Sequence, residues 1–215
     1  MGDGFFTVRQ NYAKQLSNVT SFNLTPGNTF AFGAEALLNV RNFFAIGTGL
    51  DFSVNNYDFN LTMLDNSEWA SAMNLNTLYA DNRFYSLDIP VFMRFSVDLS
   101  EERKVRWINE VGAYLSYGVG GHTNISTYRS TINPLGQLQV SHGEYKNSYF
   151  NDEQGIINEV DRTDGGFHLA TGITVSRFVF KCTFHAGMRN LARNFGVLNT
   201  KLYNMSVLFK AGYQF

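Results

Sequence analysis

Apolar and polar residues alternate along most of this chain. A period of two is the period of side chains on a β-strand, so each alternating segment predicts a strand with one apolar face. Seven segments show the pattern clearly: 29–40, 44–55, 85–97, 105–119, 167–175, 178–188 and 203–215. A weaker eighth segment lies at 5–12, and no segment of helical length carries an apolar stripe with a period of 3.6 residues. The pattern therefore predicts an all-β fold of eight strands.

The connections between these segments alternate sharply in length. The short ones are at 41–42, 98–104 and 176–177, and the long ones are at 14–28, 56–82, 120–165 and 190–202. Short turns at one end, together with both chain ends, and long loops at the other are typical of bacterial outer-membrane barrels. We therefore expect residues 1–215 to form a single domain. It would be an eight-stranded antiparallel transmembrane β-barrel with short periplasmic turns and long extracellular loops.

The direction of the apolar face decides between two kinds of barrel. In a membrane barrel this face meets lipid, whereas in a soluble lipocalin-like barrel it points inward, and periodicity alone does not distinguish them. Aromatic residues near the ends of the apolar faces indicate girdles at two membrane interfaces. These residues are Tyr85, Trp107, Tyr117, Tyr203 and Tyr213. The girdles, the loop asymmetry and the terminal Phe215 favour the membrane barrel.

Composition removes several other classes of protein. No stretch approaches the roughly 18 consecutive apolar residues of a membrane-spanning helix. The formal net charge of −1 lacks the basic footprint of a nucleic-acid binder, so we expect no nucleic-acid partner. A lone cysteine, Cys182, provides neither an intramolecular disulfide nor a thiolate metal cluster, and we expect no metal and no cofactor. The start of the chain has no signal-peptide pattern, so we expect that a signal peptide has been removed.

The carboxyl end resembles the terminal strand of outer-membrane proteins that the barrel assembly machinery recognises. A final aromatic residue preceded by apolar residues at every second position carries this resemblance, in Phe209, Ala211, Tyr213 and Phe215. It implies contact with that machinery during biogenesis.

Three further segments resemble recurrent strand motifs of the small outer-membrane β-barrel family of Bacteroidetes that includes the PorT-type proteins. They are SLDIPVFMRF at 86–95, VGAYLSYG at 111–118 and AGMRNL at 186–191. The resemblance covers residues 29–215 in pattern, apart from the long loops. It implies a porin-like Gram-negative outer-membrane protein of the cell envelope. Because the family is functionally heterogeneous, it only weakly suggests a role in secretion or envelope assembly.

Pro90 falls within a strand that has neighbours on both sides in a closed barrel. Proline removes one ladder hydrogen bond, so we expect a bulge or a local gap in pairing there.

The polar faces of the predicted strands carry charges of both signs. An eight-stranded barrel has an interior that side chains about fill, and buried charges must be paired. We therefore expect a charge network that plugs the lumen, with a gated conductance as the alternative. Its predicted members are Arg9, Glu35, Asp51, Asp88, Arg94, Arg106, Glu110, Lys181, His185, Arg189 and Lys210.

Histidines offer the main hint of catalysis. His168 and His185 are expected to face inward on adjacent strands, either as structural lumen histidines or as part of a lipid-modifying site. In the long loop at 120–165, His122, Ser141 and His142 provide a base and a nucleophile, but no motif such as G-x-S-x-G accompanies them. We expect no catalytic residues and no enzymatic activity.

The loops at 56–82 and 120–165 contain ten acidic and three basic residues, so we expect an acidic outer surface. A loop of about 46 residues is longer than a connection requires and is commonly functional. Three functions follow as hypotheses. The first is a non-enzymatic outer-membrane protein that acts through its loops or wall as an accessory subunit or surface-binding protein. Its expected partners are outer-membrane lipid and lipopolysaccharide, together with another envelope protein. The alternatives are a small gated channel and a lipid-modifying enzyme.

Overall fold

A computed structural model describes residues 2–9, 19–65, 73–100, 102, 104–132, 135–150, 160–191 and 202–215, without the side chains of 2–9, 19, 20, 22, 24, 65 and 73. The described residues form nine strands: β1 (Gly2–Arg9), β2 (Val19–Arg41), β3 (Phe44–Asp65), β4 (Met73–Ser100), β5 (Val105–Ile132), β6 (Leu138–Ser148), β7 (Thr163–Val175), β8 (Phe178–Gly187) and β9 (Tyr203–Tyr213). Over these residues, no helix is long and apolar enough to cross a membrane.

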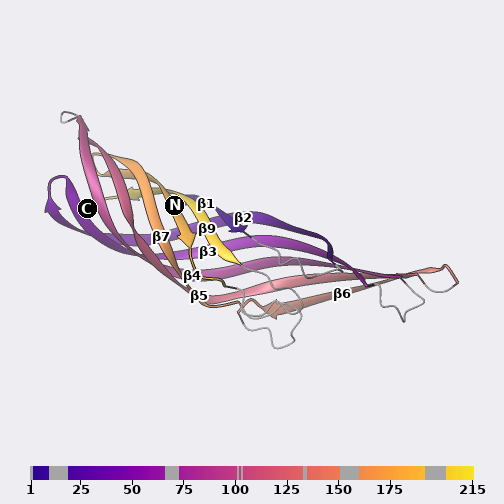
Figure 1. Ribbon diagram of the computed structural model, residues 1–215. Coiled ribbons are helices and arrows are strands. Elements are labelled where there is room, and N and C mark those ends of the chain that lie inside the picture. The colour runs from indigo at the N-terminus through magenta and orange to yellow at the C-terminus, as the bar shows by residue number, and fades with distance from the viewer. Residues whose placement is uncertain are drawn as a thin grey trace.

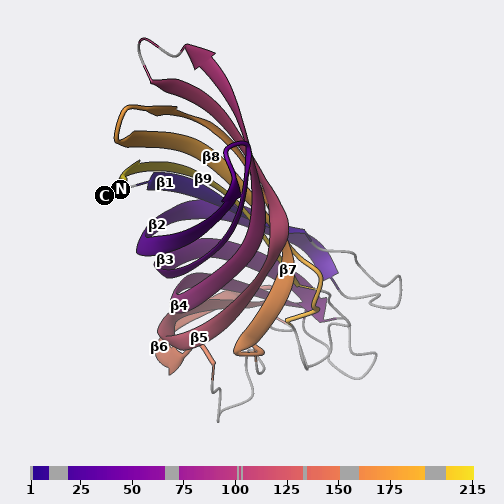
Figure 2. The ribbon, with the colours of Figure 1, turned by 90° about the vertical axis from the view of Figure 1, so that its left-hand side faces the viewer.

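Eight of the strands form the wall of an antiparallel barrel (Figures 1 and 2). The sheet order is β4-β3-β2-β1-β9-β8-β7-β5, and β4 also pairs with β5, so the ring of pairings closes. Residues 105–117 of β5 pair with β7, whereas residues 122–132 pair with β6, which is not part of the wall. The predicted eight-stranded antiparallel barrel is confirmed.

The wall is closed at β1 over only part of its height. β1 pairs with β2 between Gly2↔Ala31 and Phe5↔Asn28, and with β9 between Gly4↔Leu208 and Arg9↔Tyr203. Among the described residues, no strand lies between β2 and β9 at the end of the barrel that carries the short turns, which we call the turn-side end. A cavity of about 600 Å³ occurs there, and its lining includes Gly33 and Gly212.

The apolar face of the wall points outward. Phe32 is 65% exposed and Leu115 is 68% exposed, whereas the charged Glu110 and Lys181 are buried. This arrangement is the reverse of a water-soluble barrel, in which the apolar face fills the interior, and it matches a wall in contact with lipid. The lipocalin-like alternative is therefore wrong.

The predicted aromatic girdles lie at two levels of this wall. Trp107 lies opposite Ile173, and Tyr213 lies opposite Phe178, close to the turn at 176–177. Tyr85, Tyr117 and Tyr203 lie at the other end, where Tyr85 pairs with Gly120 and Tyr203 with Arg9. Along β9 and its end, the side chains of the predicted assembly signal, Phe209, Ala211, Tyr213 and Phe215, are all exposed.

Four wall strands, β2, β3, β4 and β5, continue past the barrel and, together with β6, form a second region, which Figure 1 shows extending to the right of the wall. We call it the projecting sheet; it comprises residues 19–28, 55–65, 73–84, 121–132 and 138–148. β4 and β5 each have 28 residues. At roughly 3.3 Å per residue each strand reaches about 90 Å, whereas the bilayer core is about 30 Å thick. The prediction of loops at 14–28, 56–82 and 120–165 is therefore wrong for most of the described residues of those segments, which lie in strands.

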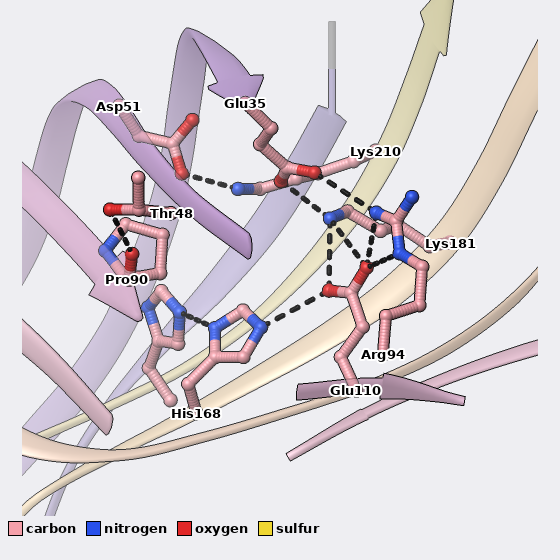
Figure 3. A network of polar contacts seen from close by, with 10 residues as sticks. Glu35, Thr48, Asp51, Pro90, Arg94, Glu110, His168, Lys181 and Lys210 are labelled. Atoms are coloured by element: carbon pink, nitrogen blue, oxygen red, sulfur yellow. Dashed lines mark hydrogen bonds and ion pairs between the residues drawn. The ribbon is translucent and has the colours of Figure 1, made fainter. Parts of the chain in front are cut away.

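Pro90 produces the predicted gap in pairing. The ladder between β3 and β4 has no partners assigned between the pairs Thr48↔Val91 and Asp51↔Asp88, and the register is the same on both sides. The Thr48 hydroxyl donates to the Pro90 carbonyl at 3.0 Å across this gap (Figure 3). The ladder with β5 runs through Pro90 without a shift, so the distortion is confined to one side of β4.

Candidate functional site

The centre of the lumen is a network of ion pairs around the buried carboxylate of Glu110 (Figure 3). Arg94 Nε donates to Glu110 Oε1 at 2.7 Å, and Lys181 Nζ donates to Glu110 Oε2 at 3.0 Å. Both bases also reach Glu35, where Lys181 Nζ donates to Oε1 at 2.5 Å and Arg94 Nη2 donates to Oε2 at 3.2 Å. Two acids and two bases from β2, β4, β5 and β8 therefore share one network across the barrel interior.

The aromatic ring of Phe92 points into the barrel and contacts this network. Arg94 Cζ and Lys181 Nζ lie 5.6 and 5.4 Å from the centroid of the buried Phe92 ring, within the range of cation–π attraction. Gly47 lies opposite Phe92, and a Cβ atom there would lie 2.5 Å from the ring. Glycine at that position is what lets the ring lie flat against the inner wall.

A second ion pair and a hydroxyl-bound carboxylate complete the charged interior. Lys210 Nζ donates to Asp51 Oδ2 at 2.5 Å. Asp88 is buried and accepts hydrogen bonds of 2.5 Å from the hydroxyls of Ser53 and Ser116. Of the predicted lumen acids, Glu35, Asp51 and Glu110 pair with the three bases Arg94, Lys181 and Lys210, and Asp88 is held by hydroxyl groups.

The histidine pair extends the network toward the outer end of the barrel. His168 Nε2 lies 3.2 Å from Glu110 Oε2, and His168 Nδ1 lies 2.8 Å from His185 Nε2. The His185 ring stacks on Tyr114 at 4.5 Å, and the Tyr114 hydroxyl donates to Asp164 Oδ2 at 2.9 Å. Both histidines are buried with partners inside the lumen, which matches a structural role.

Two predicted members of the lumen network are outside it. Arg106 donates to Asp98 at 2.5 Å near the turn-side end, and both side chains are about half exposed, at 50% and 52%. Arg189 is also half exposed and donates to Asp161 at 2.9 Å, at the outer end. The prediction is wrong for both residues. The odd or even position of a residue in a strand predicts the face on which its side chain lies, but not how far along the barrel axis it lies. The side chain of Arg9 lies outside the described residues.

An aromatic and aliphatic cluster, which we call the outer cluster, lies at the outer mouth of the barrel. It joins the base of the projecting sheet to the outer ends of β7, β8 and β9. Phe84 stacks on Tyr149 at 4.7 Å, and the ring of Phe150 lies against Gly118, where a Cβ atom would come within 2.1 Å of the ring. Its buried members are Tyr57, Phe59, Ala80, Phe84, Ile125, Tyr149, Phe150, Val160, Leu191 and Leu202. This cluster was not predicted, because its residues were assigned to loops.

The hydroxyl groups of Tyr57 and Tyr149 lie 3.0 Å apart within the outer cluster and share a hydrogen bond. Burial raises the pKa of both phenols well above the usual range, and the hydrogen bond to Tyr149 partly opposes this shift at Tyr57. Both phenols are therefore neutral over the physiological range, and the cluster introduces no charge at the mouth.

The outward face of the projecting sheet carries a row of three aromatic rings. Tyr79 and Tyr128 pack edge to face at 5.8 Å, and Tyr128 stacks on His142 at 4.6 Å. Asp58 lies directly opposite Asp81 in the ladder. Partial burial raises the pKa of Asp58 above its ordinary value, and repulsion from the neighbouring Asp81 carboxylate raises it further.

The predicted nucleophile and base of the long loop do not meet. Ser141 and His142 are consecutive residues of β6, so their side chains point to opposite faces of the sheet. His122 lies on β5 opposite Ser148, six ladder positions from the pair Tyr128↔His142. Within the described residues, moreover, no group of three His, Cys, Asp or Glu side chains is placed to hold a metal ion.

Comparison with known proteins agrees with this architecture. Residues 6–193 match the family model described as the outer membrane protein beta-barrel domain. No curated protein and no solved structure matches the chain. Outer-membrane barrels have their short turns on the periplasmic side and their long connections on the extracellular side, which puts the projecting sheet outside the cell. The match covers most of the chain and coincides with a closed ring of strands whose apolar face points outward. The chain therefore belongs to the outer membrane protein beta-barrel domain family and is an integral protein of the bacterial outer membrane.

Proposed function

We propose that this protein is a non-conducting, non-enzymatic barrel that holds the projecting sheet at the cell surface as a binding surface for an envelope protein or surface ligand. The observation that carries the proposal is the combination of an ion-pair network and an outer cluster that cross the barrel beyond the cavity on its short-turn side, with strands that continue far beyond both. Side chains of the ion-pair network cross the interior, and the outer cluster lies across the mouth. A pore would require an open path where this barrel has paired charges and stacked rings.

The absence of catalysis in this proposal is supported by the histidine contacts. His168 and His185 bind each other, Glu110 and the Tyr114 ring, all within the lumen. A lipid-modifying site would need a base at the outward, lipid-facing side of the wall. The resemblance to PorT-type barrels supports a partner that belongs to secretion or uptake machinery.

Single-channel recording in planar bilayers tests the sealed barrel. We expect no discrete steps from the reconstituted protein. Steps with a conductance that changes on Arg94→Gln substitution would contradict the proposal, because they would show ions passing the network. Arg106→Gln is the control, since Arg106 pairs with Asp98 outside the network.

Site-specific photo-crosslinking in cells tests where a partner binds. A photoreactive amino acid at Tyr128 or Tyr145, on the projecting sheet, should give a discrete higher-mass adduct. The same group at Leu115, on the lipid-facing wall, should not give that adduct. Adducts from Leu115 alone would place the contact on the wall and overturn the role of the projecting sheet.

A further inference from the structure

Among the residues that the structure describes, the projecting sheet ends in an open edge at β6. β6 pairs with β5 over eleven consecutive positions, from His122↔Ser148 to Ile132↔Leu138, and it is the last strand in the sheet order. Figure 1 shows β6 along one border of the sheet. The outer edge of such a strand presents backbone N–H and C=O groups that can pair with another chain.

β6 lacks two of the features that usually protect an edge, although it carries a third, the charged residues Glu144 and Lys146. It contains no proline, and its register with β5 has no shift along its whole length. β2, at the opposite border of the projecting sheet, contains Pro26 and has register shifts at 19–21 and at 26–29. Prolines and bulges are two of the devices by which natural sheets prevent pairing at an edge. The β2 border therefore carries a proline and bulges that the β6 border lacks.

The exposed side chains of β6 define what would fit beside it. Leu138 and Val140 are 64% and 61% exposed on one face of the strand, and Glu144 and Lys146 follow on the same face. A neighbouring strand places its side chains directly opposite these, so apolar residues suit Leu138 and Val140. A basic residue suits Glu144, and an acidic residue suits Lys146.

A second copy of this chain in the same membrane does not fit the edge. Two identical edges pair in the antiparallel direction, which puts the two barrels at opposite ends of the paired strands. β6 pairs with β5, and β5 runs unbroken from the wall into the projecting sheet. Both barrels would then be unable to enter one bilayer with the same orientation.

We propose that β6 is a docking edge that accepts an extended segment of a partner protein as an added antiparallel strand. The segment has apolar residues at alternate positions, followed toward its amino end by a basic and then an acidic residue. This inference rests on the proposed function, because it names the mode by which the projecting sheet binds its partner. Backbone hydrogen bonds would give affinity and the alternate side chains would give specificity.

A synthetic peptide provides the test. The probe is a fluorescein-labelled peptide matched to residues 138–146, with Val opposite Leu138 and Val140, Lys opposite Glu144, Glu opposite Lys146 and Thr elsewhere. Its binding to the full chain in detergent micelles is followed by fluorescence anisotropy. Two further peptides carry N-methyl groups at every second residue, in the two possible phases. Only one phase removes the N–H groups that face β6, so we expect it to bind about tenfold more weakly or worse, and the other to bind nearly as well as the parent.

A matched pair of variants locates the contact. Val140→Lys should weaken binding of the parent peptide, whereas Leu75→Lys should not, because Leu75 is an exposed apolar residue on the inner strand β4. Both variants should keep the heat-modifiable gel shift of a folded barrel. Equal loss from both methylation phases, equal effects of the two variants, or no binding of the parent peptide would overturn the inference. Conductance steps in the bilayer with normal peptide binding would instead overturn the sealed barrel and leave the docking edge intact.

Discussion

The wall and the projecting sheet are built from the same strands but have opposite polarity. On β3, the inward residues change from Asp51 and Ser53 in the wall to Tyr57 and Phe59 in the projecting sheet. The outward residues change from Leu50 to Asp58 over the same distance, without a break in the strand. The strand has the same geometry in both regions, so only the surrounding solvent differs. Lipid outside the wall selects an apolar outer face, and water outside the sheet selects a polar one.

The two regions also differ in what fills them. The interior of the wall is held by ion pairs around Glu110, and the inner face of the projecting sheet is held by the outer cluster. A charge buried in the wall needs its partner, whereas a ring in the cluster needs close packing. The two regions should therefore respond to different kinds of substitution.

Removing the central carboxylate should have the largest effect. Glu110→Ala leaves Arg94 and Lys181 with fewer partners inside the lumen, so we expect it to lower the free energy of unfolding by about 3–5 kcal/mol. Asp98→Asn removes an exposed partner of Arg106 and should change the same quantity by only about 0–1 kcal/mol. Urea unfolding in lipid vesicles measures both, and equal effects would show that the lumen pairs are solvated.

A charge on the outer face should distinguish lipid from water. Val91 points outward near the middle of the wall segment of β4, so Val91→Arg should lower the free energy of unfolding by about 2–4 kcal/mol. Asn124 is exposed on the projecting sheet, and Asn124→Arg should be neutral within about 0.5 kcal/mol. The same unfolding assay compares them, and a neutral Val91→Arg would contradict a lipid-facing wall.

The packing of the outer cluster can be tested at two neighbouring glycines. A side chain at Gly118 would overlap the Phe150 ring, so Gly118→Val should destabilise the protein by about 1–3 kcal/mol. A Cβ atom at Gly120 would have its nearest neighbour, in Tyr85, at 3.9 Å, and Gly120→Val should have little effect. Unfolding by urea gives both values. A tolerated Gly118→Val would mean that Phe150 does not pack there.

The smallest effect concerns the paired acids of the projecting sheet. Because the pKa of Asp58 is raised in the folded state, its protonated form contributes stability that is lost as pH rises upward from its ordinary value of 3.8. Asp58→Asn should remove this loss and raise the stability at pH 7 by about 0.2–1 kcal/mol, as expected for like charges directly opposite in a sheet. Unfolding measured between pH 4 and pH 7 provides the test, with Asp98→Asn as the control. A wild-type stability that does not fall over this range would contradict repulsion between Asp58 and Asp81.

Much of the wall follows from the sequence. The period of two identifies the strands, and parity correctly turns Glu35, Arg94 and Glu110 toward the interior. Parity does not give the height of a residue along the barrel, which is why Arg106 and Arg189 were placed wrongly. It also does not give partners: Glu35 and Lys181 are 146 positions apart, and their meeting depends on how strands from different parts of the wall are staggered.

The projecting sheet could have been recognised from the same signal. The alternation continues through Tyr57, Phe59 and Leu61, but on the face that was polar in the preceding segment. Because a change of polar face usually marks the end of a strand, the segment was assigned to a loop. A change of face without a break in period marks a change of solvent around one strand.

Depth-dependent fluorescence quenching tests the boundary between the two regions most directly. Single cysteines on β3, at the outward positions 50, 52, 54, 56, 58 and 60 and at the inward positions 51 and 53, would each carry an environment-sensitive label in a Cys182→Ser background and be exposed to brominated lipids. We predict strong quenching by lipid at 50, 52 and 54 and none at 58 and 60, with 56 near the boundary. Quenching that continues to 60, or that occurs at the inward positions 51 and 53 instead, would contradict the reversal of polarity on which this account depends.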